Sequence, residues 1–106
     1  MLVNGQLNGG RSAKMIVNYY ATLRQVVGVR QVEYCLPQGS TLRQLIAEMV
    51  KRYPDLKREM LDRSGNLQSH IHIYINGRDS TLLDDSVDSI LAPSDTISIF
   101  PPVGGG

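Results

Sequence analysis

The sequence predicts an α+β fold in which a mixed sheet packs on one main helix. Several segments alternate apolar and polar side chains with the period of two that is typical of half-buried strands. One central segment instead repeats its apolar residues every three or four positions, as an amphipathic helix does. Because a single helix has one apolar stripe, it can cover only one face of a small sheet.

The chain has the length and composition of one domain. It has 106 residues, of which 42% are hydrophobic, and this is ordinary for a soluble globular protein. The net charge is +1 and the charges look interspersed, so we expect protein partners and no nucleic-acid footprint. The apolar runs are much shorter than the ~20 residues of a membrane span, and the N-terminal residues lack the apolar core that a signal peptide would have. We therefore expect a cytoplasmic protein that binds no membrane.

Residues 15–21 are expected to form the first strand and residues 30–36 the second, with a turn at Gly28 between them. Two alternating segments joined by a turn predict a hairpin, whose apolar face would be formed by Met15, Val17, Tyr19, Val32, Tyr34 and Leu36. The preceding residues, 1–14, are rich in Asn and Gly and have no apolar period. We expect them to form a flexible N-terminal extension.

The main helix is expected to start at Thr41 and to end near Tyr53. Thr41 and Gln44 have the spacing of a capping box, and Pro54 disfavours helical geometry in the residue before it. The apolar stripe, which we assign to the core, contains Leu42, Leu45, Ile46, Met49 and Tyr53. A shorter helical turn is expected over residues 55–61.

Two further strands are expected at residues 70–75 and 96–100. The dipeptide Asn76-Gly77 predicts a tight turn after the first of them, and two prolines stop ladder pairing after the second. This order of elements predicts a β-grasp domain over residues 15–100. The sheet face away from the helix would be open to a partner and would carry His70, His72, Tyr74 and Phe100.

The chain ends in a proline pair followed by Val103 and three glycines. Glycine has no side chain and no preferred dihedral well, so we expect residues 101–106 to form a flexible tail. Such a tail can pass through a narrow channel and present the unhindered carboxylate of Gly106. Adenylation followed by attack of sulfur on the acyl adenylate would convert that carboxylate to a thiocarboxylate.

Residues 95–106, Asp-Thr-Ile-Ser-Ile-Phe-Pro-Pro-Val-Gly-Gly-Gly, resemble the C-terminal signature of the MoaD/ThiS sulfur-carrier family. Residues 20–24, Tyr-Ala-Thr-Leu-Arg, together with Gly28, resemble that family's first strand and turn. The resemblance spans residues 15–106 and is nearest to the small subunit of molybdopterin synthase. It implies a ubiquitin-like β-grasp, adenylation by a ubiquitin-activating-type enzyme that consumes ATP, and thiocarboxylation of Gly106.

The resemblance implies a carrier that has no active site and binds no cofactor. The activating enzyme and the large molybdopterin synthase subunit would supply catalysis, and the sulfur would enter molybdopterin biosynthesis. Gly104 and Gly105 would thread the tail into these partners. The partner-binding residues would be Phe100, Pro101, Pro102, Val103, His72 and Tyr74.

Other functions stay open. Residues 70–78, with the long connection before them, are also similar to carriers that donate sulfur to cysteine synthesis and to archaeal small modifiers. The same tail would serve thiamine-type biosynthesis or conjugation to target lysines. A non-covalent interaction module, by contrast, would not use its tail.

No metal site is predicted, because His70 and His72 have no further ligands near them in sequence. Cys35 is the only cysteine, and we expect an inert, half-buried strand residue. Arg24 could contact an acidic surface of a partner, but a lone arginine after a strand is usually a solvated charge, and this is what we expect. For Phe100 two interpretations stay open: it folds against the sheet edge, or it contacts the activating enzyme.

Overall fold

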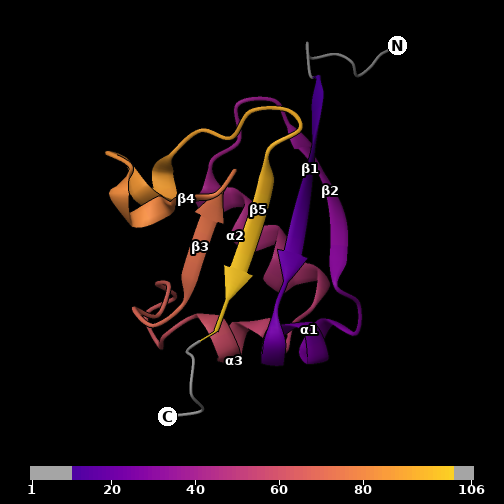
Figure 1. The fold of residues 1–106 in the computed structure, drawn as a ribbon, viewed down its shortest axis with the longest axis vertical. Helices are drawn as coiled ribbons and strands as arrows, with labels where there is room; N and C mark the ends of the chain where they lie inside the picture. The colour runs from indigo at the N-terminus through magenta and orange to yellow at the C-terminus, as the bar shows by residue number, and fades with distance from the viewer. Residues whose placement is uncertain (1–10, 102–106) are drawn as a thin grey trace.

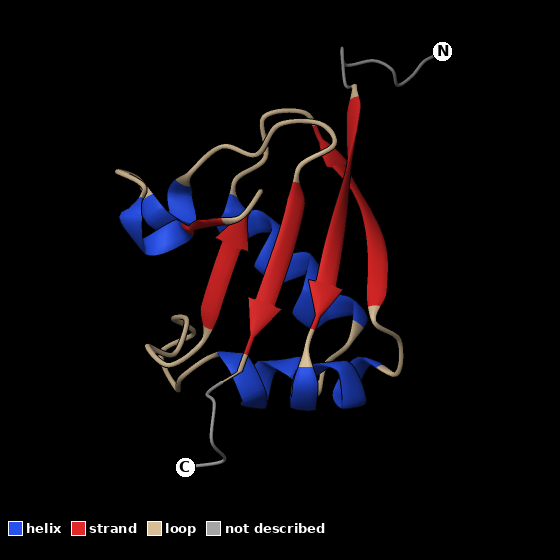
Figure 2. Cartoon of the chain, viewed as in Figure 1, coloured by secondary structure: helices blue, strands red, loops and turns tan. Residues whose placement is uncertain are grey.

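The structure is a computed structural model and describes residues 11–101. Five strands form one sheet in the order β2-β1-β5-β3-β4, and the main helix, α2, lies behind it (Figures 1 and 2). β1 and β5 are parallel, and the other neighbouring strands are antiparallel. The mixed sheet on one main helix confirms the predicted β-grasp.

The elements follow one another along the chain as β1 (Ser12–Tyr19), α1 (Ala21–Val27), β2 (Gln31–Pro37), α2 (Leu42–Arg52), α3 (Leu56–Met60), β3 (His72–Ile75), β4 (Arg78–Asp79), the 3-10 helices η2 (Ser80–Leu82) and η3 (Ser86–Asp88), and β5 (Thr96–Phe100).

The first strand begins three residues earlier than predicted. Residues 12–14 belong to β1 and pair with β2, so their assignment to a flexible extension is wrong. The physical reason is Ala13, which is buried and lies opposite the buried Leu36. Apolar burial on one face thus continues to the start of the strand.

The predicted hairpin turn at Gly28 is replaced by a short helix, α1. This helix buries Leu23 in the core and ends at Gly28, whose φ of 93° lies in the left-handed region that glycine adopts readily. The Gly28 N–H donates to the carbonyl of Arg24 at 2.8 Å. β1 and β2 nevertheless pair in the predicted antiparallel manner.

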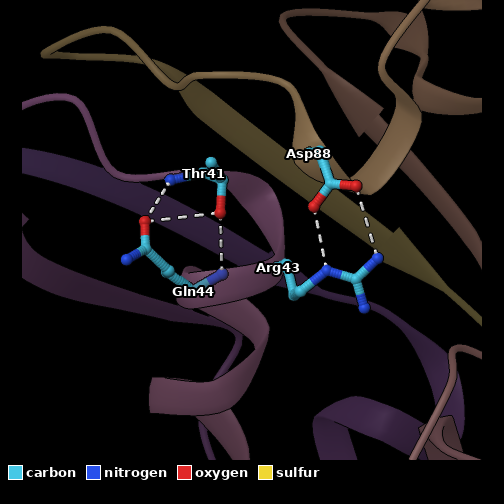
Figure 3. Close-up of polar contacts among 4 residues, drawn as sticks. All are labelled: Thr41, Arg43, Gln44 and Asp88. Atoms are coloured by element: carbon cyan, nitrogen blue, oxygen red, sulfur yellow. Dashed lines mark hydrogen bonds and ion pairs between the residues drawn. The ribbon is translucent and has the colours of Figure 1, made fainter.

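The predicted capping box opens α2. The N–H of Gln44 donates to the Thr41 hydroxyl at 3.2 Å, and the N–H of Thr41 donates to the Gln44 side chain at 2.8 Å (Figure 3). Four residues of the predicted helix stripe are buried, Leu42, Leu45, Ile46 and Met49, and the fifth, Tyr53, is the half-buried C-cap residue. α3 lies within the expected residues 55–61.

The chain between β3 and β5 contains structure that the sequence did not predict. β3 begins at His72, two residues after its predicted start. The short β4 and two 3-10 helices follow, and the buried Leu91 then donates its N–H to the carbonyl of Ser40 at 2.8 Å. This segment therefore packs against the start of α2. In the described part of the chain, no helix is long and apolar enough to cross a membrane.

Candidate functional site

The predicted tail begins where the central strand of the sheet, β5, ends. β5 runs between β1 and β3 and ends beside α1 and α3 (Figure 1). Pro101 is buried there and, having no N–H, cannot continue the ladder. The other residues predicted for the tail, Pro102, Val103, Gly104, Gly105 and Gly106, lie outside the described residues.

Three aromatic rings meet where the tail begins, and we call Tyr20, Tyr74 and Phe100 the aromatic platform. The rings of Phe100 and Tyr20 are stacked, with centroids 4.2 Å apart and planes 12° apart. The ring of Tyr74 meets Phe100 edge-on, at 5.6 Å and 89°. Both geometries are favourable for aromatic pairs, so the platform is preformed.

The position of Phe100 excludes one of its two interpretations, that the residue folds against the sheet edge. The residue cannot fold against a sheet edge, because β5 is an inner strand with a neighbour on each side. It is half-buried on the outer face, directly across from His72 of β3. Phe100 therefore presents apolar surface next to the tail.

Tyr20 and Arg24 were not predicted as site residues. The N–H of Tyr20 donates to the carbonyl of Ile99 at 3.2 Å, which places its ring beside Phe100. Arg24 lies one helical turn later, with its guanidinium carbon 5.9 Å from the centroid of the Tyr20 ring. Its Nε donates to the carbonyl of Tyr19 at 3.3 Å, so Arg24 is not the freely solvated charge that we expected. The spacing of four between an aromatic residue and an arginine on a helix is the signal that could have indicated this contact.

A shallow hollow of about 500 Å³ extends from the platform over the outer face of the sheet, lined by His72, Tyr74, Gly77, Ser98, Phe100 and Pro101. Four of the six predicted partner-binding residues, His72, Tyr74, Phe100 and Pro101, therefore line one continuous surface. Its walls are mainly apolar, as expected of a docking site for another protein chain.

One acidic group stands near this hollow. The Thr81 hydroxyl and N–H donate to Asp79 at 2.7 Å and 2.9 Å, and these bonds are the main cause that lowers the pKa of its carboxyl. The positive potential of His72 contributes a smaller lowering. Asp79 therefore stays charged and presents an acceptor beside the otherwise apolar surface.

Two residues considered in the sequence lie away from this surface. His70 precedes β3 in a turn, so the two histidines do not share a strand face. Cys35 is exposed, which corrects the expectation of half-burial, and it lies opposite Lys14. Lys14 is five residues from Tyr19, or about 17 Å along β1. Within residues 11–101, no three His, Cys, Asp or Glu side chains gather as a metal site would require.

The sequence matches one protein family and resembles known proteins over most of its length. The model of the ThiS family matches residues 17–106, a span that includes the last three residues of β1, the whole platform and the C-terminal glycines. Small archaeal modifier protein 3 of Haloferax volcanii is 28% identical over 90 residues, which cover 85% of this chain and 96% of that protein.

Solved structures share the fold. The crystal structure of SAMP1 from Haloferax volcanii superposes with a TM-score of 0.79 at 26% identity and covers 89% of this chain and 100% of that one. A putative molybdopterin converting factor, subunit 1, from Pyrococcus furiosus is 35% identical with a TM-score of 0.70, over 87% of this chain and 100% of that one. The shared architecture is the ubiquitin-like β-grasp.

Proposed function

The chain belongs to the ThiS family of small carrier and modifier proteins, and on that premise we propose that it carries sulfur as a thiocarboxylate on Gly106. Members of this family are not catalytic themselves and are activated by ubiquitin-activating-type enzymes. One observation carries the proposal. β5, held between two neighbouring strands, ends at Phe100, six residues before Gly106.

The chemistry requires only that this carboxylate reach the nucleotide of the activating enzyme. A carboxylate oxygen of Gly106 attacks the α-phosphate of ATP, and pyrophosphate leaves. Hydrosulfide then attacks the acyl carbon, AMP leaves, and the C–S bond of the thiocarboxylate remains. Because Gly104, Gly105 and Gly106 have no side chains, nothing on the tail hinders either attack.

The aromatic platform is the surface that we propose for docking. It combines exposed apolar area with rings that are already ordered, so binding loses little side-chain entropy. It also lies at the root of the tail, where a bound partner must contact the domain while it holds Gly106. We propose His72, Pro101, Pro102 and Val103 as further contacts of the same partner.

We propose the large subunit of molybdopterin synthase as the first sulfur acceptor to test. The Pyrococcus furiosus structure, which is 35% identical to this chain, is described as a molybdopterin converting factor subunit, and this supports the choice. A second candidate function is conjugation to target lysines, supported by the likeness to small archaeal modifier protein 3. Cysteine or thiamine-type biosynthesis would use the same loaded tail.

Intact-protein mass spectrometry tests the carrier function. The full chain is incubated with ATP, Mg²⁺, sulfide and a ubiquitin-activating-type enzyme from the same genome, beside a chain that lacks Gly105 and Gly106. We expect a gain of about 16 Da, the exchange of oxygen for sulfur, on the full chain alone. If an enzyme that loads another carrier leaves the full chain unchanged, the carrier function is wrong for that pairing, and the result favours a non-covalent module.

Conjugation is distinguished by the products. It would give an isopeptide bond to lysine, whereas sulfur transfer regenerates the free chain. The last Lys or Arg of the sequence is Arg78, so trypsin would leave all of residues 79–106 on a target lysine. Additional cleavage at Asp95 would shorten that remnant to residues 96–106 and make it easier to identify.

A further inference from the structure

Charge is segregated along this chain. All eleven Lys and Arg residues precede Asp79, and the five charged residues from Asp79 onwards are all aspartates. The expectation of interspersed charge is therefore wrong for the last part of the sequence. Up to Arg78 the cations exceed the carboxylates by six, and after it the chain carries five negative charges.

The fold places part of this positive charge around the root of the tail. α1, α3 and the end of α2 lie where β5 ends, whereas β4, η2 and η3 lie at the other end of the sheet (Figure 1). We call the cations at the tail end the basic pole: Arg24, Arg30, Lys51, Arg52, Lys57, Arg58 and Arg63. The same segments carry three carboxylates, Asp55, Glu59 and Asp62, which leave a surplus of four positive charges.

The basic pole is not neutralised within the described residues. The two ion pairs of residues 11–101 join Lys14 to Glu33 and Arg43 to Asp88, so neither uses a cation of the pole. Arg24 and Arg52 donate to backbone carbonyls. The remaining five cations are all exposed, so their field extends into solvent.

We propose that the basic pole docks against an acidic protein surface on the activating enzyme, beside the entrance that receives the tail. This inference rests on the proposed function. Residues 102–106 span at most about 18 Å when fully extended, so the end of the domain must approach the enzyme closely when Gly106 reaches the nucleotide. The groups at that end are the platform and the basic pole, and opposite charge on the enzyme orients the encounter.

Charge reversal at the two ends of the domain tests the proposal. The variant K57E/R58E reverses two exposed cations of α3, and the control R11E/R78E reverses two exposed cations at the other end, with the same change in net charge. Folding of both is checked by circular dichroism and thermal unfolding. The rate of pyrophosphate release by the activating enzyme is then measured at limiting carrier over a range of salt concentrations.

We expect kcat/KM of K57E/R58E to fall by about tenfold or more at low salt, and the deficit to shrink as salt screens the charges. The control should stay within about twofold of the native chain. Equal losses in the two variants, or a loss that salt does not change, would overturn the proposal. So would an unchanged kcat/KM accompanied by binding of a duplex RNA that only K57E/R58E loses, because the pole would then serve a nucleic acid.

Failure of this inference is separable from failure of the carrier function. At saturating concentration and high salt, K57E/R58E should still gain about 16 Da, because its tail is intact. If the native chain gains mass and both variants react equally, the docking inference alone is wrong. If the native chain gains no mass with a competent enzyme, the carrier function itself is wrong.

Discussion

The ring of Phe100 lies nearly parallel to the ring of Tyr20, with 4.2 Å between their centroids, although the two residues come from opposite ends of the chain. Parallel pairing of β1 and β5 brings them together. Tyr19 lies across from Ile99, so the next residue of each strand emerges at the same end of the sheet. The first strand therefore supports the residue from which the tail departs.

This stacking should contribute measurably to stability. In a double-mutant cycle of Tyr20→Leu and Phe100→Leu, we expect a coupling of about 1 kcal/mol in the free energy of unfolding, because stacked rings attract beyond their buried area. Urea unfolding of the four proteins measures it. Tyr20→Phe keeps the ring and should behave as the native chain does, whereas a coupling near zero would show that the stack adds nothing.

The same ring should matter for activation. Because Phe100 presents apolar surface at the tail root, we expect Phe100→Leu to raise KM of the activating enzyme for the carrier by about tenfold and to leave kcat nearly unchanged. Steady-state pyrophosphate release measures both constants. Leu82→Ala is the matched control, since Leu82 is 77% exposed but lies in η2, away from the tail. An equal rise in KM for the control would argue against a specific platform.

Much of the fold was predictable because its signals are local. Alternation in β1 and β2, the stripe of α2 and the capping box of Thr41 and Gln44 each lie within a few neighbouring residues. The helix α1 was missed because it is only seven residues long and fully buries one side chain, Leu23. Residues 80–91 were missed because their burial depends on distant partners, such as Ser40 for Leu91.

The candidate site was predictable only in part, for a related reason. Alternation along β3 and β5 placed His72, Tyr74 and Phe100 on one face, and the structure brings these three together. Tyr20 and Arg24 reach the platform through the parallel pairing of β1 with β5. Periodicity assigns a residue to a face of its own strand, but it does not tell which distant strand lies next to it.

Ala21 has an unusual backbone conformation that a mutation should relieve. Its φ is 52°, in the left-handed region, which costs a residue with a Cβ about 1–2 kcal/mol. We expect Ala21→Gly to raise the free energy of unfolding by up to about 1 kcal/mol, after the added chain entropy of glycine. Thermal and urea unfolding measure the change.

Gly28 provides the opposite test at the other end of α1. Its φ is 93°, and a Cβ there would meet no atom within 4 Å, so only backbone strain opposes a side chain. Gly28→Ala should therefore lower the free energy of unfolding by about 1 kcal/mol. Destabilisation by Ala21→Gly, or no loss with Gly28→Ala, would contradict this account of the helix ends.

The start of α2 offers a comparison between a cap and a surface ion pair (Figure 3). Thr41→Ala removes the side-chain acceptor for the Gln44 N–H, and we expect a loss of about 1 kcal/mol that salt does not change. The Arg43–Asp88 pair, with Nε and Oδ1 2.9 Å apart, is exposed to solvent. A double-mutant cycle on that pair should give a coupling that disappears at high salt.

Stability should also depend on pH through a buried pair of tyrosines. The hydroxyls of Tyr19 and Tyr34 are 2.8 Å apart, and burial raises the pKa of both above the ordinary value of 10.0. Above pH 10 the unfolded chain loses protons that the folded chain retains, so the free energy of unfolding falls as pH rises. Below pH 10 both states are protonated and the contribution is fully present. We expect a fall of about 1 kcal/mol per pH unit for each tyrosine above that value.

Urea unfolding between about pH 8 and about pH 11 measures this slope, and phenylalanine variants assign it. Tyr19→Phe should lower the free energy of unfolding by about 1–2 kcal/mol at neutral pH, because it leaves the Tyr34 hydroxyl without its partner. Tyr34 is only 3% exposed, so water cannot readily replace that partner. The double variant Tyr19→Phe/Tyr34→Phe should lose less than the sum of the single variants, because it leaves no hydroxyl unpaired. It should also lose the part of the alkaline slope that the pair supplies. If its slope above pH 10 equals that of the native chain, the alkaline sensitivity arises from other groups and the buried pair has no part in it.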